Sequence, residues 1–346
     1  MNLKSRTDHP PPHPNRNQLV SLSILLFGIV LLFFSIIISI HFGAANLSYR
    51  DVVYAIFQFD KENSAHIIIR ELRLPRAIAA ICVGAALAVS GAIMQGMTRN
   101  PLASPSIMGV TAGSSFLIAI ALAFIPGITY LGLMMFSFIG AGVGATLVFG
   151  ISSLSKGGIT PVKLALAGSA ITSLLSSLST ATGIKFNISK DISYWFVGGV
   201  SSVQPQHIYF ALPFILGGLV FALFLSRSIS ILSLGEETAK GLGQNTSLVK
   251  LSGTIVVLLL TGAAVSIAGM IGFIGLVIPH ITRFLVGTDY RWIIPFSAIL
   301  GGILLIAADI VGRMVNPPFE TPVGAVTAII GVPFFLYLAR KEGRGL

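Results

Sequence analysis

The twenty residues AIAAICVGAALAVSGAIMQG, residues 77–96, decide the fold class of this 346-residue chain. They carry no charge, and about 20 apolar residues are what an α-helix needs to cross the hydrocarbon core of a membrane. The many glycine and alanine residues are typical of membrane helices that pack closely against their neighbours. We therefore expect an integral membrane protein with further spans elsewhere in the chain.

The composition indicates the same class. Apolar residues make up 54% of the chain and charged residues only 10%, and the mean hydropathy is +0.90. A soluble domain carries roughly 25% charged residues, so an aqueous globular fold is excluded. The net charge of +10 does not indicate nucleic-acid binding, because the basic residues stand in short clusters between apolar runs. The single cysteine, Cys82, allows no intrachain disulfide and is expected to serve packing.

Ten apolar runs predict an all-α polytopic protein with about ten transmembrane helices. The runs are 19–41, 77–96, 106–125, 130–151, 162–183, 208–226, 251–268, 271–288, 293–312 and 322–339. The first run is longer than the core of a signal peptide and lacks a clear cleavage site, so we expect it to be retained. Before it, residues 1–18 form a polar, proline-rich segment that we expect to be a disordered cytoplasmic tail. Residues 19–346 are expected to form a single transmembrane domain.

The basic residues predict that both termini are cytoplasmic. With the N-terminus inside, 14 of the 22 lysine and arginine residues fall on the cytoplasmic side, in the direction of the positive-inside rule. The other eight fall outside and require their own explanation: Arg50, Lys61, Arg70, Arg73, Arg76, Lys185, Lys190 and Arg313.

Comparing the sequence with itself, shifted by 178 positions, suggests an internal repeat. The shift superimposes Gly84-Ala85-Ala86 on Gly262-Ala263-Ala264, and three single matches follow: Gly91 with Gly269, Pro101 with Pro279, and Gly109 with Gly287. Five crossings would separate the two copies, so the halves would run in opposite directions, as in many transporters. Small residues also recur in membrane helices simply because they allow close packing.

Ionisable groups are rare inside the predicted spans, which argues against a proton- or sodium-driven carrier. Asp309 is the only acid there. The run 162–183 is instead rich in hydroxyl groups, and four of them follow helical spacing on one face: Ser169, Ser173, Ser176 and Thr180. Such a stripe suits either the passage of a large polar ligand or hydrogen bonding between helices.

No phosphate-binding loop of the form Gly-x-x-x-x-Gly-Lys-[Ser/Thr] occurs in the chain. Any ATP, with its Mg²⁺, would have to be bound by a partner. Residues 234–243 form a charged segment between two spans, with acids at its start and glycines at its end, as in a short helix. This segment is a candidate docking site for such a partner, although a solvated loop would have a similar composition.

The chain resembles the FecCD-type permeases, the membrane subunits of ABC importers for iron-siderophores, haem and cobalamin. The matching stretches begin at Arg73-Leu74-Pro75-Arg76 and continue in order to the C-terminus. They are 90–96, SGAIMQG; 99–105, RNPLASP; 234–243, LGEETAKGLG; 272–283, GFIGLVIPHITR; and 308–313, ADIVGR. The resemblance implies a cobalamin-permease-like type II importer fold, a permease dimer, two cytoplasmic ATPase subunits and an extracytoplasmic binding protein.

The resemblance also implies roles for individual residues. Arginines at positions 73, 76 and 313 would pair with carboxylates of the binding protein; snorkelling to lipid headgroups is the other interpretation. The coupling helices would lie at about 234–243, with these residues at the ATPase: Leu234, Gly235, Glu236, Glu237, Ala239, Gly241 and Gly243. The inner gate would lie at Thr160, Pro161 and Val162, where the chain departs from the small hydroxyl residues of the cobalamin permease. Asp309 is expected to hold a nearby cation or backbone group.

These observations predict a permease of the bacterial cytoplasmic membrane that imports a ferric siderophore. Cobalamin or haem is the alternative cargo, and an ion-coupled secondary transporter is the alternative from a different class. We expect no catalytic residues, no metal site and no cofactor on this chain, because no paired carboxylates, metal-ligand cluster or nucleophile–base pair is found within the spans.

Overall fold

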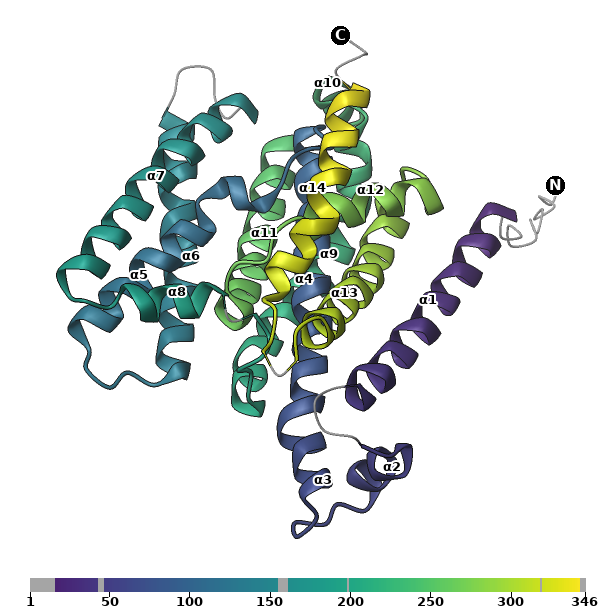
Figure 1. Ribbon diagram of the computed structural model, residues 1–346. Coiled ribbons are helices and arrows are strands. Elements are labelled where there is room, and N and C mark those ends of the chain that lie inside the picture. Colours follow the sequence, from purple (N-terminus) through teal and green to yellow (C-terminus); the bar gives the residue numbers. More distant parts are fainter. Residues whose placement is uncertain (1–15, 43–46, 155–160, 198, 318, 343–346) are drawn as a thin grey trace, which may run out of the picture.

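A computed structural model of the chain describes residues 16–42, 47–154, 161–197, 199–317 and 319–342. The described residues are almost entirely helical (Figure 1). The helices are α1 (Arg16–His41), α2 (Tyr49–Phe57), α3 (Ser64–Ile67), the π-helix η1 (Ile68–Arg73), α4 (Leu74–Thr98), the 3-10 helix η2 (Pro105–Met108), α5 (Val110–Phe124), α6 (Tyr130–Leu154), α7 (Pro161–Lys185), α8 (Ser189–Val197), α9 (Pro205–Ser233), α10 (Glu236–Gly241), α11 (Thr246–Ala268), α12 (Ile274–Val286), α13 (Tyr290–Met314) and α14 (Val323–Glu342).

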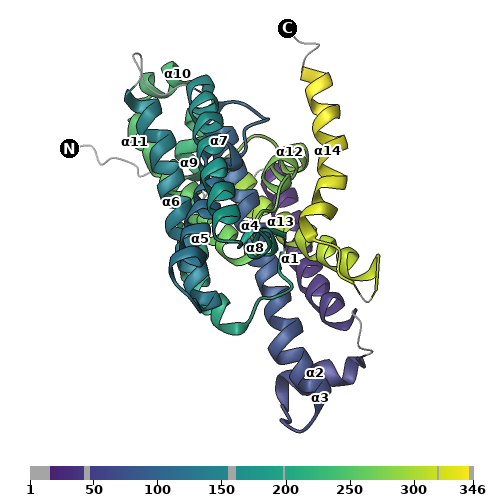
Figure 2. The same ribbon diagram turned by 60° about the vertical axis from the view of Figure 1, so that its left-hand side comes forward.

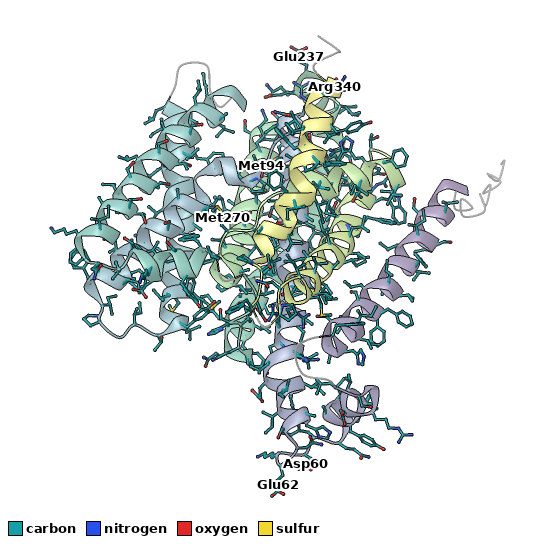
Figure 3. The ribbon with its side chains drawn as sticks, viewed as in Figure 1. Asp60, Glu62, Met94, Glu237, Met270 and Arg340 are labelled. Atoms are coloured by element: carbon teal, nitrogen blue, oxygen red, sulfur yellow. The ribbon has the colours of Figure 1, made fainter. Side chains whose placement is uncertain are left out.

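The long helices form one bundle with two distinct ends. The short helix α10 and the last turn of α14 lie at one end, and α2 and α3 lie at the other (Figures 1 and 2). We call these the α10 end and the α3 end. Glu237 and Arg340 mark the first, and Asp60 and Glu62 mark the second (Figure 3).

An apolar helix lies at each of the ten predicted ranges. Seven helical segments are long and apolar enough to cross a membrane: Val20–His41, Ser64–Thr98, Tyr130–Leu154, Lys163–Lys185, Pro205–Ser233, Thr246–Ala268 and Tyr290–Met314. Helix α14 has 20 residues, whereas α5 and α12 are shorter, with 15 and 13 residues. The expected fold class is therefore confirmed, while two of the ten predicted spans fall below the length of a full span.

The ends of two predicted segments, the N-terminal tail and the turn that holds the gate, differ from the structure. Helix α1 begins at Arg16, so the expected disordered tail 1–18 ends earlier than predicted; its first fifteen residues lie outside the described part of the chain. At the predicted gate, Thr160 also lies outside the described residues. Pro161 and Val162 form the first turn of α7.

Helix α4 is the centre of the bundle. It packs against α9, α11, α12 and α13, and nearly every residue from Ala77 to Gly96 is buried. In a lipid environment, helices are held together by close packing and interhelical hydrogen bonds, because lipid tails are as apolar as the side chains. Two glycines of α4 allow that packing: Gly84 meets the backbone of Gly301 in α13, and Gly91 meets the backbone of Gly275 in α12.

The two halves of the bundle repeat the same packing in opposite directions. Helix α4 packs on α13 in the way that α11 packs on α6, and α5, α6 and α7 pack together as do α12, α13 and α14. Helix α4 runs toward the α10 end, whereas α11 starts beside α10 and runs away from it (Figure 1). Gly84 contacts Gly301 of α13, and Gly262, 178 positions after Gly84, contacts Ala141 of α6. The inverted repeat is thus present, with Gly84 and Gly262 in corresponding contacts. The register of 178 does not hold over the whole of this helix, because it superimposes Gly91, inside α4, on Gly269, which follows the end of α11.

The register of 178 also fails beyond that helix. It superimposes Pro101, in the connection after α4, on Pro279, in the middle of α12. It also pairs Gly109, before α5, with Gly287, before α13. The contacts at Ala141 and Gly301 give a shift of 160 positions for α6 and α13. The physical cause is a difference in length: the connection after α11 is shorter than the one after α4, and α12 is shorter than α5.

We predict that Gly91→Ala destabilises the bundle. A Cβ atom at this position would overlap the backbone of Gly275, and neither backbone can move independently of its helix. Overpacking of this kind costs about 1–3 kcal/mol. The matched control is Gly217→Ala in α9, where a Cβ atom would meet nothing within 4 Å. Thermal unfolding in detergent should show a lower midpoint for Gly91→Ala and an unchanged or slightly higher one for Gly217→Ala; equal midpoints would contradict the packing argument.

Candidate functional site

The α3 end holds a compact network of charged side chains around Asp309. This aspartate of α13 is fully buried, and it accepts hydrogen bonds from Arg76 of α4 at 2.8 and 3.0 Å. Arg313, one turn further along α13, approaches the same carboxylate at 3.1 Å. Arg76 also bonds Glu320 at 2.8 Å, and the side chain of Glu320 is 44% exposed. The predicted role of Asp309 as the partner of a nearby cation is therefore confirmed.

Arg313 of this network and the neighbouring Arg73 hold the end of α1. Arg73 is buried and donates to the carbonyl oxygens of Ile40 and His41 at 2.6 and 2.9 Å. Arg313 donates to the carbonyl oxygens of Ser39 and Phe42 at 3.2 and 2.9 Å. The last carbonyl groups of a helix have no partner within the helix, so these guanidinium groups satisfy acceptors that lipid cannot. The network thus joins α1, α4 and α13.

The three predicted docking arginines therefore lie together, and each already has partners within the chain. Arg73 and Arg313 are turned toward α1, whereas Arg76 reaches the surface through its contact with Glu320. Of the three, Arg76 is the one that a docking protein can reach with the least rearrangement. The sequence did not indicate Glu320, whose partner lies 244 positions away.

At the α10 end, the predicted coupling segment forms the short helix α10. Ala239 is buried against Leu232 and Val249, which fixes the helix on α9 and α11. Glu236 accepts from Lys250 at 2.6 Å and from Lys240 at 3.1 Å. These hydrogen bonds, with that of Lys250 the stronger, hold the pKa of the Glu236 carboxyl at about 2, so the group stays ionised at neutral pH. Helix α10 is therefore attached to the bundle by an apolar contact and a charged one.

The remaining residues of the coupling segment face outward or form its turns. Gly235 and Gly243 have φ angles of +133° and +79°, which favour glycine. Glu237 and Gly241 are exposed. Leu234 is 68% exposed and Leu242 is 66% exposed. Exposed leucines on both sides of a short anchored helix form a surface that a partner protein can bind.

Helix α7 carries the predicted hydroxyl stripe on its exposed side. Ser169, Ser173, Ser176 and Thr180 are all exposed, whereas Ile171, Leu175 and Ser179 of the same helix are buried against the bundle. Helix α7 stands at the edge of the bundle (Figure 1). The predicted common face is thus real, and it points away from the other helices of this chain.

One polar contact between the two halves was not indicated by the sequence. Gln95, buried in α4, donates to the carbonyl oxygens of Gly275 and Leu276 at 3.3 Å, and its own carbonyl oxygen accepts from Arg283 of α12. Both residues stand in stretches that match the family motifs, but nothing in the sequence pairs them. Among the described residues, no group of three or more histidine, cysteine, aspartate or glutamate side chains is placed to hold a metal ion.

This architecture defines a polytopic α-helical membrane permease with the fold of the type II ABC importer permeases. Residues 31–341 match the FecCD transport family, and the chain belongs to that family. It is 59% identical over 323 residues to the iron(3+)-hydroxamate import system permease protein FhuB of Bacillus subtilis, covering 93% of this chain and 84% of that protein. It is 49% identical over 309 residues to the iron-uptake system permease protein FeuB of the same organism, covering 89% and 92%.

A solved structure shares the fold of this chain over nearly the whole length of both proteins. It is described as an inward-facing conformation of a metal-chelate type ABC transporter, and it superimposes with a TM-score of 0.81 at 31% sequence identity. The superposition covers 92% of this chain and 99% of that one.

We predict that Asp309→Asn destabilises the protein far more than Glu320→Gln. The first change leaves two nearly buried guanidinium groups, Arg76 and Arg313, without their shared carboxylate. Removing one partner of a buried ion pair costs about 3–5 kcal/mol. Glu320 is partly exposed, so its removal should cost less than about 1 kcal/mol. Thermal unfolding of both variants in detergent measures the difference, and equal midpoints would show that the Asp309 network does not hold the bundle.

Proposed function

We propose that the chain is the permease subunit of an ATP-driven importer of a ferric siderophore in a bacterial cytoplasmic membrane. The observation that carries this proposal is the 59% identity, over 93% of the chain, with the FhuB protein named for iron(3+)-hydroxamate import. Ferric hydroxamates are therefore the first class of cargo to test. Haem and cobalamin are the alternative cargoes within the family.

We infer that ATP is hydrolysed by separate subunits. The chain has no phosphate-binding loop, so ATP and Mg²⁺ belong to a partner. The α10 segment is the proposed contact with that partner, because it is anchored at Ala239 and Glu236 and exposes Leu234 and Leu242. Closure of the ATP-bound subunits would then push on α10 and, through α9 and α11, on the bundle, shifting it between two conformations.

The proposed orientation places the α10 end in the cytoplasm. The chain segments expected on that side hold 14 of the 22 basic residues, as the positive-inside rule requires. Helix α1 begins and α14 ends at this same end, so both termini would be cytoplasmic (Figure 1). An extracytoplasmic binding protein would then dock at the α3 end.

In this docking, Arg76 is proposed to make the direct contact, because its second partner, Glu320, is exposed and can be replaced by a carboxylate of the binding protein. Arg73 and Arg313 would keep the docking surface in place by holding α1. The exposed hydroxyl face of α7 is proposed to line the translocation path against a second permease subunit, either an identical or a similar chain. The gate at Thr160, Pro161 and Val162 is proposed at the cytoplasmic start of α7.

Uptake by proteoliposomes tests the proposed function. The chain would be reconstituted with its second permease and ATPase subunits, and supplied with binding protein and iron-labelled ferric hydroxamate, haem or labelled cobalamin. We expect ATP-dependent accumulation of the ferric hydroxamate and none without the ATPase or the binding protein. Accumulation driven by an ion gradient alone would identify a secondary transporter, and ATP-dependent uptake of haem or cobalamin alone would change the cargo.

The same assay tests the α10 contact. The double variant Leu234→Asp/Leu242→Asp places charges on the two exposed leucines, and we expect uptake to fall at least tenfold, which corresponds to about 1.4 kcal/mol of lost coupling. The matched control, Leu234→Met/Leu242→Met, keeps the surface apolar and should retain uptake. Both variants should unfold at the wild-type temperature, since neither side chain is buried. Normal uptake by the aspartate variant would exclude this surface as the ATPase contact.

A further inference from the structure

A cleft of about 820 Å³ opens at the α10 end, between the last turns of α4, α9 and α12 and the first turn of α13. Four arginines line it: Arg99, Arg227, Arg283 and Arg291. The only acid among its lining residues is Asp289. The cleft reaches Leu234, which directly precedes α10, and the guanidinium group of Arg99 lies beside Gly235.

Most of the positive charge in this cleft has no counter-charge within the described part of the chain. Asp289 is occupied by Arg291, at 2.7 and 2.9 Å. Arg283 is bonded to the neutral side chain of Gln95. Arg99 and Arg227 make no hydrogen bond or ion pair with any described residue. The network at the α3 end differs, because Arg73, Arg76 and Arg313 are held by Asp309, Glu320 and helix carbonyl groups. Three guanidinium groups around one cleft therefore favour an anionic ligand, and guanidinium geometry suits phosphate oxygens.

The side of the cleft formed by α9 is continuous with an exposed apolar stripe. Tyr209, Leu216, Val220 and Phe224 are 76, 50, 49 and 80% exposed, and their spacings of seven and four residues place them on one side of the helix. Arg227 is the next residue in this series, and it is also exposed. The stripe lies along a helix of the length that spans a membrane, and its apolar side chains suit lipid acyl chains. An acyl chain lying on this stripe would bring its headgroup to Arg227 and into the cleft.

We propose that this cleft binds the phosphate of an anionic phospholipid, with the acyl chains along the exposed face of α9. Basic pockets between the ends of transmembrane helices are suited to such headgroups, because each arginine near the membrane surface attracts anionic lipid. The bound lipid neutralises Arg99 and Arg227 and links α4 to α9 beside the segment that carries α10. The site does not depend on which cargo the permease carries.

Lipid retention by the full-length chain tests the proposal. Wild type and variants would be placed in nanodiscs of neutral phosphatidylcholine with a minor share of phosphatidylglycerol or cardiolipin, then extracted in mild detergent. The anionic lipid that stays bound would be measured by quantitative mass spectrometry. We expect enrichment of anionic lipid on the wild type, a fall of about fivefold in Arg227→Gln, and a fall of more than tenfold in Arg99→Gln/Arg227→Gln. Equal retention by wild type and the double variant would overturn the proposal.

The matched control is Arg50→Gln/Arg70→Gln, which removes two exposed arginines at the α3 end and should retain the lipid as wild type does. Arg227→Gln changes an exposed side chain, so a wild-type unfolding temperature for it excludes misfolding as the cause. Displacement of the lipid by millimolar inorganic phosphate would identify the site as one for free phosphate. Unchanged lipid retention with lost co-purification of the ATPase subunit would assign the arginines to an acidic surface of that subunit. Either result overturns the lipid assignment.

Discussion

The structure depends on one helix, α4, lying at the centre of the bundle in contact with α9, α11, α12 and α13. A membrane provides little hydrophobic force between helices, so this burial requires close contact of backbones. Gly84 and Gly91 allow that contact with α13 and α12. Because α4 joins the Arg76–Asp309 network at one end to the Gln95–Arg283 contact near the other, it holds both charged regions in fixed positions. Helices α11, α12 and α13 of the second half pack against it, in the inverted arrangement of the two halves.

Charged side chains around Asp309 are paired at one end of the bundle, whereas two arginines of the cleft at the other end lack partners among the described residues. The proposed function rests on this difference. At the α3 end, buried arginines are paired with Asp309, Glu320 and the last carbonyl groups of α1. Such paired groups are costly to separate, so this end is expected to be rigid. At the α10 end, exposed leucines flank α10 and unpaired arginines line a cleft. Groups without partners among the residues that the structure describes are available to other molecules, here proposed to be an ATPase subunit and a phospholipid.

Much of the fold could be predicted from the sequence, because the length and apolarity of the runs follow directly from membrane thickness. The hydroxyl face of α7 was also predictable from helical spacing. The repeat register of 178 failed because the two halves have connections and helices of different lengths. The partners of the arginines were not predictable. Arg73 bonds carbonyl groups 33 and 32 positions earlier, and Arg76 bonds a carboxylate 233 positions later, so only the folded chain brings them together.

The central claim is that these two ends face opposite sides of the membrane, with α10 inside. Glu62 and Glu237 are exposed at opposite ends of the bundle (Figure 3). In a Cys82→Ser background, single cysteines would be introduced as Glu62→Cys or Glu237→Cys and treated with a membrane-impermeant maleimide in intact spheroplasts. We expect labelling at position 62 in intact spheroplasts and at position 237 only after permeabilisation. Labelling of position 237 in intact spheroplasts would contradict the account.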